Sequence, residues 1–196
     1  MVASFNSRSR PEKSPSLPDK VSAIHHALRE AKIPHAIGGA LALAYYAEPR
    51  ATIDVDINVF VSTERWPEIC ETLAPLGINV EVEVKDLNRD GQVRLWWDRN
   101  PVDLFFSYDP FHDAMRRDAR KVPFNDETIP ILSPEHLAVC KAMFDRPKDW
   151  LDIPQVLVGV EGFDASEVRR WLDATVGSND LRCVHFDELA YELLGR

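Results

Sequence analysis

The stretch IGGALALAYYAEPRATIDVDINVFV, from Ile37 to Val61, decides the fold of this protein. Residues 52–61 alternate polar with apolar side chains and are rich in β-branched residues, which predicts a strand. Side chains two residues apart on a strand share a face, so Asp54 and Asp56 should lie side by side. Two carboxylates in an apolar run are costly to bury without a positive partner. A divalent cation such as Mg²⁺, which prefers oxygen ligands, would be a suitable partner.

Two other features add to this pair of aspartates. Gly38 and Gly39 lie between a predicted short strand and a predicted helix, where the backbone can approach a ligand and N–H groups can face a phosphate. Asp103, in NPVDLFFS, lies on an otherwise apolar predicted strand that follows a hairpin turn. A tight turn would explain the glycines, and a solvent-edge position would explain Asp103. Together, three such aspartates and a glycine turn are a rarer combination, which indicates a site for metal and phosphate.

The whole pattern predicts the α+β class, in which a mixed sheet with flanking helices precedes a C-terminal helical bundle. We divide the chain into a disordered tail over 1–18, a core over 19–110 and a mainly helical domain over 111–196. Hydrophobic periodicity and the start, stop and turn residues define the elements. Helices are predicted at 18–33, 40–47, 65–77, 111–121, 134–145, 150–160, 164–175 and 185–195, strands at 35–39, 52–61, 78–84, 92–98 and 102–107, and an extended link at 127–134.

The composition is that of a soluble globular protein, with 196 residues of which 45% are hydrophobic and 28% charged. Three widely spaced cysteines argue against a disulfide framework and against a thiolate metal site. No apolar run approaches the roughly 20 residues that span a bilayer, and the Ser- and Pro-rich N-terminus lacks the apolar stretch of a signal peptide. We therefore expect a cytoplasmic protein with no membrane partner.

The net charge of −9 argues against broad electrostatic binding to nucleic acid, but it is compatible with a local basic groove. Trp96 and Trp97 should point to opposite faces of their strand, one into the core and the other free to stack on a base. The histidines receive no catalytic role. None are paired at metal-ligand spacing except the adjacent His25 and His26, which cannot share a helix face. The basic residues available for such a groove are Arg89, Arg94, Arg99, the segment 116–120, Arg146 and Lys148.

The order of these motifs resembles the nucleotidyltransferase fold of the DNA polymerase β superfamily: a strand, Gly-Gly, a helix, a strand bearing DVD, and a later strand bearing one more aspartate. Within that superfamily, IGGALALAYYAEPRATIDVDINV and LAVCKAMFDRPKDWLDI are similar to the AbiEii/MenT-like toxin nucleotidyltransferases. The similarity covers about residues 20–160. The chain departs from the family pattern in the long spacing from Gly39 to Asp54 and in Pro147 and Lys148 of the late motif.

The resemblance implies a nucleotidyltransferase-like core whose metal site is made of three aspartates. Asp54, Asp56 and Asp103 would hold two Mg²⁺ ions. Asp103 would also serve as the base for an attacking hydroxyl. Gly38 and Gly39 would approach the triphosphate of the NTP substrate, which the resemblance suggests is CTP or UTP.

The late motif adds basic and acidic residues to this implied site. Lys141, Arg146 and Lys148 would contact the triphosphate, while Asp149 and Asp152 would orient the lysine or the base, which makes Lys141 and Asp152 candidate catalytic residues. The alternative for Lys141 is a surface ion pair with Asp145 at i and i+4 of a helix. The alternative for the two acidic residues is that they cap a helix or are solvated.

Two residues just before Asp54 complete the expected nucleotide site. Arg50 is expected to contact phosphate or one of the aspartates, and Thr52 to contact phosphate from the same strand face. The resemblance also suggests inhibitory phosphorylation of Thr52, because a phosphate there would add negative charge beside the three carboxylates and obstruct the metals and the nucleotide. The alternative is that Thr52 is simply a good strand former.

The resemblance implies a toxin that moves a nucleoside monophosphate, with a pyrimidine preferred, from an NTP to the 3′ end of tRNA. Such a product would block aminoacylation and growth, and a cognate antitoxin would be the partner. A second hypothesis keeps the chemistry and changes the acceptor to an antibiotic or protein hydroxyl, which an acidic enzyme would suit if the antibiotic were cationic. A third is an inactive binding module with this fold, which three retained aspartates argue against.

Overall fold

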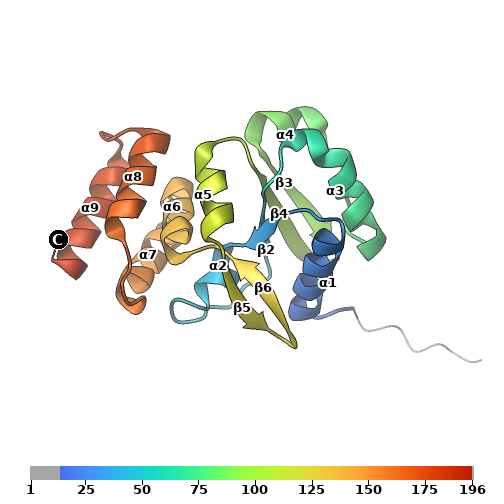
Figure 1. Cartoon of the computed structure of the whole chain (residues 1–196), viewed down its shortest axis with the longest axis horizontal. Coiled ribbons are helices and arrows are strands. Elements are labelled where there is room, and N and C mark those ends of the chain that lie inside the picture. Colours follow the sequence, from blue (N-terminus) through green and yellow to red (C-terminus); the bar gives the residue numbers. More distant parts are fainter. Residues whose placement is uncertain (1–13, 196) are drawn as a thin grey trace, which may run out of the picture.

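The computed structural model describes residues 14–195, and a single six-stranded mixed sheet lies at the centre of this part of the chain (Figure 1). The strand order is β3-β4-β2-β1-β6-β5. The α+β class expected from the sequence is therefore confirmed. The strands are β1 (His35–Ile37), β2 (Val55–Val59), β3 (Gln92–Trp97), β4 (Asn100–Phe106), β5 (Arg120–Phe124) and β6 (Glu127–Ile131).

The centre of the sheet is the parallel pair of β2 and β4, which sets the register of the functional residues. Val55 pairs with Val102 and Ile57 with Leu104, and all four side chains are buried. These apolar residues lock the register, because a one-residue slip would turn them to the opposite face. As a result Asp56 lies directly opposite Asp103.

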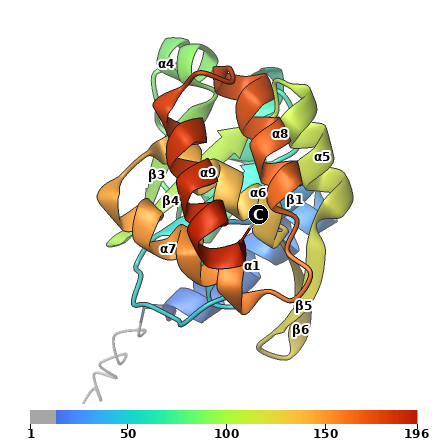
Figure 2. The same cartoon turned by 90° about the vertical axis from the view of Figure 1, so that its left-hand side faces the viewer.

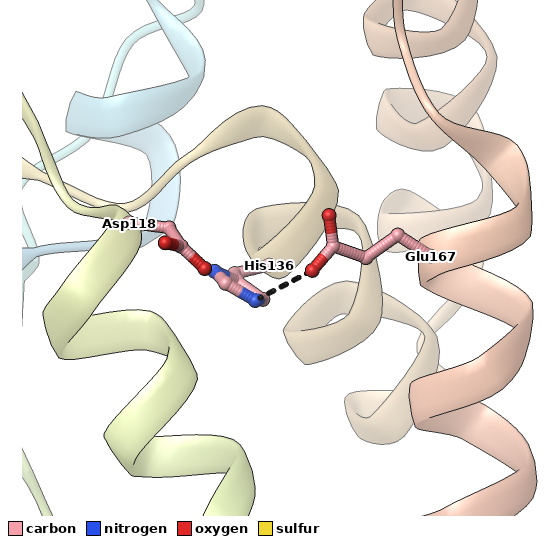
Figure 3. Close-up of side chains that lie close together, drawn as sticks. All are labelled: Asp118, His136 and Glu167. Carbon is pink, nitrogen blue, oxygen red and sulfur yellow. Dashed lines mark ion pairs between the residues drawn. The ribbon is translucent and has the colours of Figure 1, made fainter.

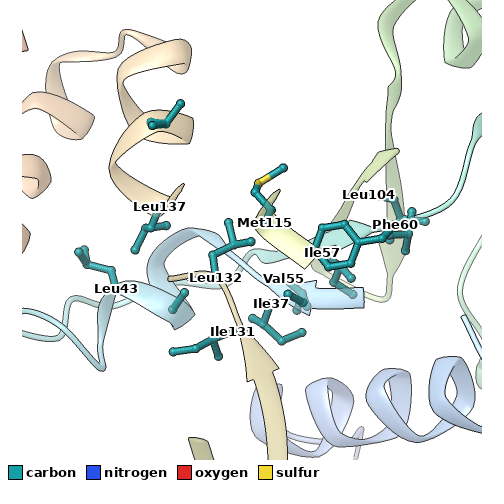
Figure 4. Close-up of a cluster of buried hydrophobic side chains, with 14 of the residues drawn as sticks. Ile37, Leu43, Val55, Ile57, Phe60, Leu104, Met115, Ile131, Leu132 and Leu137 are labelled. Carbon is teal, nitrogen blue, oxygen red and sulfur yellow. The ribbon is translucent and has the colours of Figure 1, made fainter. Parts of the chain in front are cut away.

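Helices pack against the sheet, and the C-terminal helices lie beyond one end of the sheet region (Figures 1 and 2). Helix α1 packs on α3, α2 packs on β2 and α6, and α6 to α9 form the C-terminal helical region. Buried side chains from the strands and from α2, α5 and α6 meet in one apolar core (Figure 4). The helices are α1 (Leu17–Glu30), α2 (Gly39–Leu43), α3 (Trp66–Leu73), α4 (Val84–Asp90), α5 (Pro110–Asp118), α6 (Pro134–Phe144), α7 (Pro147–Gly159), α8 (Ala165–Val176) and α9 (Leu181–Leu194), with short 3₁₀ turns at Thr63–Arg65 and Ala74–Leu76.

The structure differs from the predicted elements in several places. The helix predicted at 111–121 ends at Asp118, because residues 120–124 form β5, which pairs with β6, and the helix α4 was not predicted. The predicted strand at 78–84 is wrong: only Asn79 forms an isolated bridge, to Trp96, and the chain then enters α4. Val80 and Val82 are only partly buried, so the alternating pattern has no sheet face to cover. The predicted strand at 52–61 begins only at Val55. The segment predicted as a link at 127–134 instead contributes β6, so the sheet continues beyond residue 110.

The ends of two helices bear on the predicted tail and on the proline of the late motif. Ser16 caps α1 through a reciprocal capping box with Asp19, so this helix begins inside the predicted tail, whose residues 1–13 lie outside the described residues. Pro147 does not interrupt a helix but begins α7, where the missing N–H costs nothing. The division into a core over 19–110 and a helical domain over 111–196 stays a prediction. Among the described residues no helix is both long and apolar enough to cross a bilayer.

Candidate active site

The three aspartates singled out in the sequence line one cavity of about 270 Å³. Asp54 lies immediately before β2, Asp56 within it, and Asp103 opposite Asp56 on β4. Burial, together with the neighbouring Asp103 and Asp54, raises the pKa of Asp56 from 3.8 to about 6. A raised pKa in a carboxylate means that negative charge is under-compensated there, and a bound cation would relieve it.

Gly39 brings backbone against the Asp56 carboxylate. Its φ is +55°, and a Cβ built at this position would lie 1.8 Å from Asp56 Oδ2. The adjacent Gly38 N–H donates to the Asp56 carbonyl at 2.8 Å, which fixes the end of β1 beside β2. Both the left-handed backbone and the close approach require glycine at 39. The neighbour that the structure shows at Gly39 is thus a carboxylate, and the approach of the glycine pair to a triphosphate stays a prediction.

Asp103 is held by a partner that the sequence analysis did not assign to it. Arg94 Nε and Nη2 donate to its two oxygens at 2.8 and 2.7 Å. The Asp103 carboxylate also raises the pKa of Arg94. This pairing could have been found from the hairpin, because Trp97 pairs with Asn100 and counting back along the strands sets Arg94 opposite Asp103.

Lys141 is buried, which is incompatible with the surface ion pair considered from the sequence. Its Nζ lies 2.6 Å from Asp152 Oδ2 and 3.7 Å from Asp149 Oδ1. The Asp145 carboxylate instead accepts from Trp150 Nε1. Helix α6 carries Lys141 into the site because Ser133 caps its start and its apolar residues pack on the core.

Arg50 and Asp152 lie far apart in the sequence and form an ion pair. Arg50 donates to both Asp152 oxygens, at 3.1 to 3.3 Å, so it contacts an aspartate of α7 rather than one of the three strand aspartates. Hydrogen bonds from Lys141 and Arg50 outweigh the opposing effect of burial and lower the pKa of Asp152. Asp152 is therefore a fully paired carboxylate.

The last predicted residues lie at the edge of the cavity. Arg146 donates to the buried Asp149 at 2.5 and 3.1 Å, and Lys148 is exposed while lining the same cavity. Thr52 lies before β2, not in it, and its Oγ1 accepts a hydrogen bond from the Asp54 N–H at 3.1 Å. Thr52 thus supports the backbone of Asp54 and also lines the cavity.

The donor set suits Mg²⁺, but the ligand atoms of the three carboxylates do not all lie within 4.8 Å of one another. All three candidates offer the hard oxygen ligands that Mg²⁺ takes. Within residues 14–195, a group of three ligand atoms mutually within 4.8 Å occurs elsewhere, and not at these aspartates. Because Asp103 is paired with Arg94, a metal ion that uses all three carboxylates would compete with that arginine for the Asp103 oxygens.

Aromatic side chains that the sequence analysis did not connect with the site line the rest of the cavity. Phe105 and Phe144 contact edge to face, and the ring of Tyr108 lies tilted against that of His112. Alternation on β4 carries Phe105 to the same face as Asp103, which the strand pattern could have predicted. Beside the carboxylates, the cavity therefore offers an apolar wall.

Similar solved structures have the nucleotidyltransferase fold. No protein-family model and no curated protein matches the sequence. The antibiotic-resistance factor ANT(2″)-Ia has a similar structure, with a TM-score of 0.58, 16% identity and coverage of 90% of this chain and 99% of that one. So has the lincosamide antibiotic adenylyltransferase LnuA, with a TM-score of 0.52, 15% identity and coverage of 70% and 94%.

A third similar structure is an antigenic nucleotidyltransferase-like protein from Paracoccidioides brasiliensis, with a TM-score of 0.53, 18% identity and coverage of 87% and 92%. The fold expected from the sequence motifs is thereby confirmed. At such identities the likeness concerns the fold, and the chemistry of this chain has to be argued from its own residues.

Proposed function

We propose that this protein is a Mg²⁺-dependent nucleotidyltransferase, which transfers a nucleoside monophosphate from an NTP to an acceptor hydroxyl. The observation that carries the proposal is the meeting of Asp54, Asp56 and Asp103 in one cavity, where Asp56 has a raised pKa and no cationic hydrogen-bond partner among the described residues. In the reaction the acceptor oxygen bonds to the α-phosphorus, the bond to the β-phosphate oxygen breaks, and pyrophosphate leaves.

The chain's own residues would prepare this displacement. Asp54, Asp56 and Asp103 would hold two Mg²⁺ ions, which when bound lower the pKa of the acceptor hydroxyl and neutralise the triphosphate. Once released by Arg94, Asp103 could accept the hydroxyl proton.

Basic side chains at the cavity would bind the phosphates. Lys148 and Arg146 are exposed there, and Lys141 lies deeper. Arg50 and Asp152 would hold Lys141 in position, because all three belong to one ion-pair network. The backbone of Gly38 and Gly39, at the start of α2, would approach the triphosphate, as the resemblance implies.

For the acceptor, we propose the 3′ end of tRNA, with CTP or UTP as donor. This part rests on the resemblance of the two motifs to AbiEii/MenT-like toxins, and on exposed basic groups at the cavity such as Lys148. It makes the protein a growth-blocking toxin of the cytoplasm with a cognate antitoxin. Phosphorylation of Thr52 would inhibit it, because the phosphate would sit beside Asp54 and add charge where the NTP binds.

A small-molecule hydroxyl is the second candidate acceptor. It is favoured by the apolar and aromatic wall of the cavity and by the net charge of −9, which suits a cationic antibiotic. A structure of ANT(2″)-Ia contains adenylyl-2″-tobramycin, and that of LnuA contains lincomycin. A binding module without activity is disfavoured, because it would keep crowded carboxylates that destabilise the fold without metal.

The acceptor is tested by incubating the full chain with Mg²⁺ and each of four α-labelled NTPs, together with total tRNA, tobramycin or lincomycin. We expect label from CTP or UTP on tRNA 3′ ends, and none with the Asp56→Asn variant. Label on an antibiotic alone would replace tRNA by the second acceptor. Absence of transfer to every acceptor, combined with no Mg²⁺-dependent NTP binding in calorimetry, would contradict the proposed chemistry itself.

A further inference from the structure

A second cluster of metal-ligating side chains lies away from the residues of the proposed reaction. Asp118 ends α5, His136 lies in the first turn of α6, and Glu167 lies in the first turn of α8. Each offers one ligand atom, and the three atoms lie within 4.8 Å of one another. Figure 3 shows the imidazole of His136 between the two carboxylates.

His136 gives an independent reason to look for a ligand here. Its side chain is buried, and its Nε2 has no hydrogen-bond partner within the described residues. The nearest acidic oxygen, Glu167 Oε1, lies 3.6 Å from Nε2, which is too long for a hydrogen bond. A buried ring nitrogen without a partner costs stability, and this one is directed toward carboxylates.

The surroundings of His136 favour an imidazole that can bind metal. Burial lowers its pKa, so that the neutral ring predominates at neutral pH even though Glu167 and Asp118 act in the opposite direction. Its Nδ1 lies 3.0 Å from Ser133 Oγ. When Nδ1–H donates to that oxygen, the lone pair is on Nε2, and a hydrogen bond of this kind orients metal-bound histidines generally.

We propose that Asp118, His136 and Glu167 form a binding site for a divalent transition metal, with Zn²⁺ as the best match and water completing the coordination. One imidazole nitrogen with two carboxylate oxygens suits Zn²⁺, whereas Mg²⁺ takes oxygen ligands and keeps waters. The Asp118 and Glu167 side chains are 37% and 25% exposed, so an ion can enter from solvent.

Binding requires small movements of the two carboxylates. Ligand bonds of about 2 Å draw the three atoms closer together than the separations seen here. Arg117 holds Asp118, and Arg170 lies 3.3 Å from the Glu167 oxygen that faces His136, so the metal competes with this arginine. Both arginine side chains are 65% exposed and can turn to solvent.

An ion at this site would join α5 and α8 to α6, the helix that carries Lys141. Helices α6 and α8 already pack together, and a metal ligand from each would add a further link between the sheet region and the C-terminal helices. Because the metal binds the folded chain, it should raise thermal stability. This role does not depend on the proposed nucleotidyl transfer.

The test is a Zn²⁺ titration of the full chain carrying Asp56→Asn, followed by competition with a chromophoric chelator and by thermal melts. Asp118→Asn and Glu167→Gln are the test variants, and Asp113→Asn, an exposed carboxylate on the same helix α5, is the matched control. We expect one Zn²⁺ per chain and a higher Tm, with affinity about tenfold lower or worse in both test variants. The control should bind as its parent does.

A histidine-specific readout separates ligation from a general effect of charge. The ¹⁵N signal of His136 Nε2 should shift on adding Zn²⁺ and stay in place with millimolar Mg²⁺. The proposal is overturned if Zn²⁺ leaves that signal and the Tm unchanged, or if Asp113→Asn weakens binding as much as the two test variants do.

Discussion

Two groups of aspartates in this protein have the same chemistry and opposite surroundings. On the strands, Asp56 is crowded by other carboxylates, and its pKa is raised to about 6. On helix α7, Asp149 and Asp152 are buried as well, yet each is paired with a cation, and the pKa of Asp152 is lowered. The difference teaches that burial alone does not decide how a carboxylate titrates. A buried carboxylate without a cationic hydrogen-bond partner, such as Asp56, keeps charge that a bound cation would neutralise.

The largest expected effect is a loss of nucleotide transfer when Asp56 is replaced. Asp56→Asn should lower nucleotide transfer on the order of a thousandfold or more, because a metal ligand and several kcal/mol of charge stabilisation are lost. The measurement is single-turnover transfer with saturating Mg²⁺. Asp90→Asn removes a carboxylate from the same cavity but from α4, and should retain most activity. Equal losses in the two variants would refute the assignment of Asp56.

For Asp149 and Asp152 of α7, the main expected effect of removing their cation is a loss of stability. Lys141→Met leaves Asp152 and Asp149 short of a cation and should cost about 3–5 kcal/mol of unfolding free energy, measured by urea denaturation. Adding Asp152→Asn should recover much of that stability by removing one uncompensated charge. If Lys141 also binds the triphosphate, NTP affinity in the double variant stays low. Recovered NTP affinity would limit Lys141 to a structural role.

Alanine substitutions at two glycines can separate the effect of backbone strain from the effect of a collision with Asp56. Gly39→Ala and Gly162→Ala both place alanine at a positive φ, but a Cβ collides with Asp56 only at 39 and meets nothing within 4 Å at 162. Both should cost about 1–3 kcal/mol of stability. Only the first should also displace the carboxylate and lower activity, by about a hundredfold. Similar activities in both variants would argue that the contact is unimportant.

The raised pKa of Asp56 predicts a pH dependence of stability with a definite sign. The folded pKa, about 6, exceeds the ordinary 3.8, so the ionised side chain destabilises the metal-free fold as pH rises from about 4 to above 6. In EDTA, Asp56→Asn should therefore exceed the parent in stability at pH 7.5, by at most about 3 kcal/mol. The two should converge near pH 4. The lowered pKa of Asp152 acts in the opposite direction, because its stabilisation is lost in acid.

The smallest expected effect concerns the arginine that holds Asp103. Arg94→Gln should raise Mg²⁺ affinity a few-fold, or roughly 1 kcal/mol, because the metal no longer competes with a charge-assisted pair. Isothermal calorimetry with Mg²⁺ measures this. Arg99→Gln makes the same charge change at an exposed position in the β3–β4 turn and should leave the affinity unaltered. A weaker Mg²⁺ site in Arg94→Gln would show instead that Arg94 helps position Asp103.

Local pattern was sufficient for the central strands and most helices. Alternation in TIDVDINVFV predicted one shared face for Asp54 and Asp56, and in the structure both line the same cavity while Val55 and Ile57 are buried. The same rule failed at 78–84, because a strand also needs a neighbour to pair with and a face to cover, and neither is visible in the local sequence. The strand at 127–131 was missed for the converse reason: its partners, β1 and β5, supply its stability.

By itself, the sequence determined the α+β class and that Asp56 and Asp103 lie on strands, since these follow from side-chain periodicity and backbone preference within a few residues. It wrongly extended the first of these strands to Asp54. Only the tertiary structure decided the partners of each charge. It set Arg94 on Asp103, buried Lys141 between two carboxylates of α7, and brought His136 beside residues from two other helices. The physical reason is that the electrostatic energy of a charge depends on distance and on exclusion from water. Both quantities are set by segments far apart in the chain.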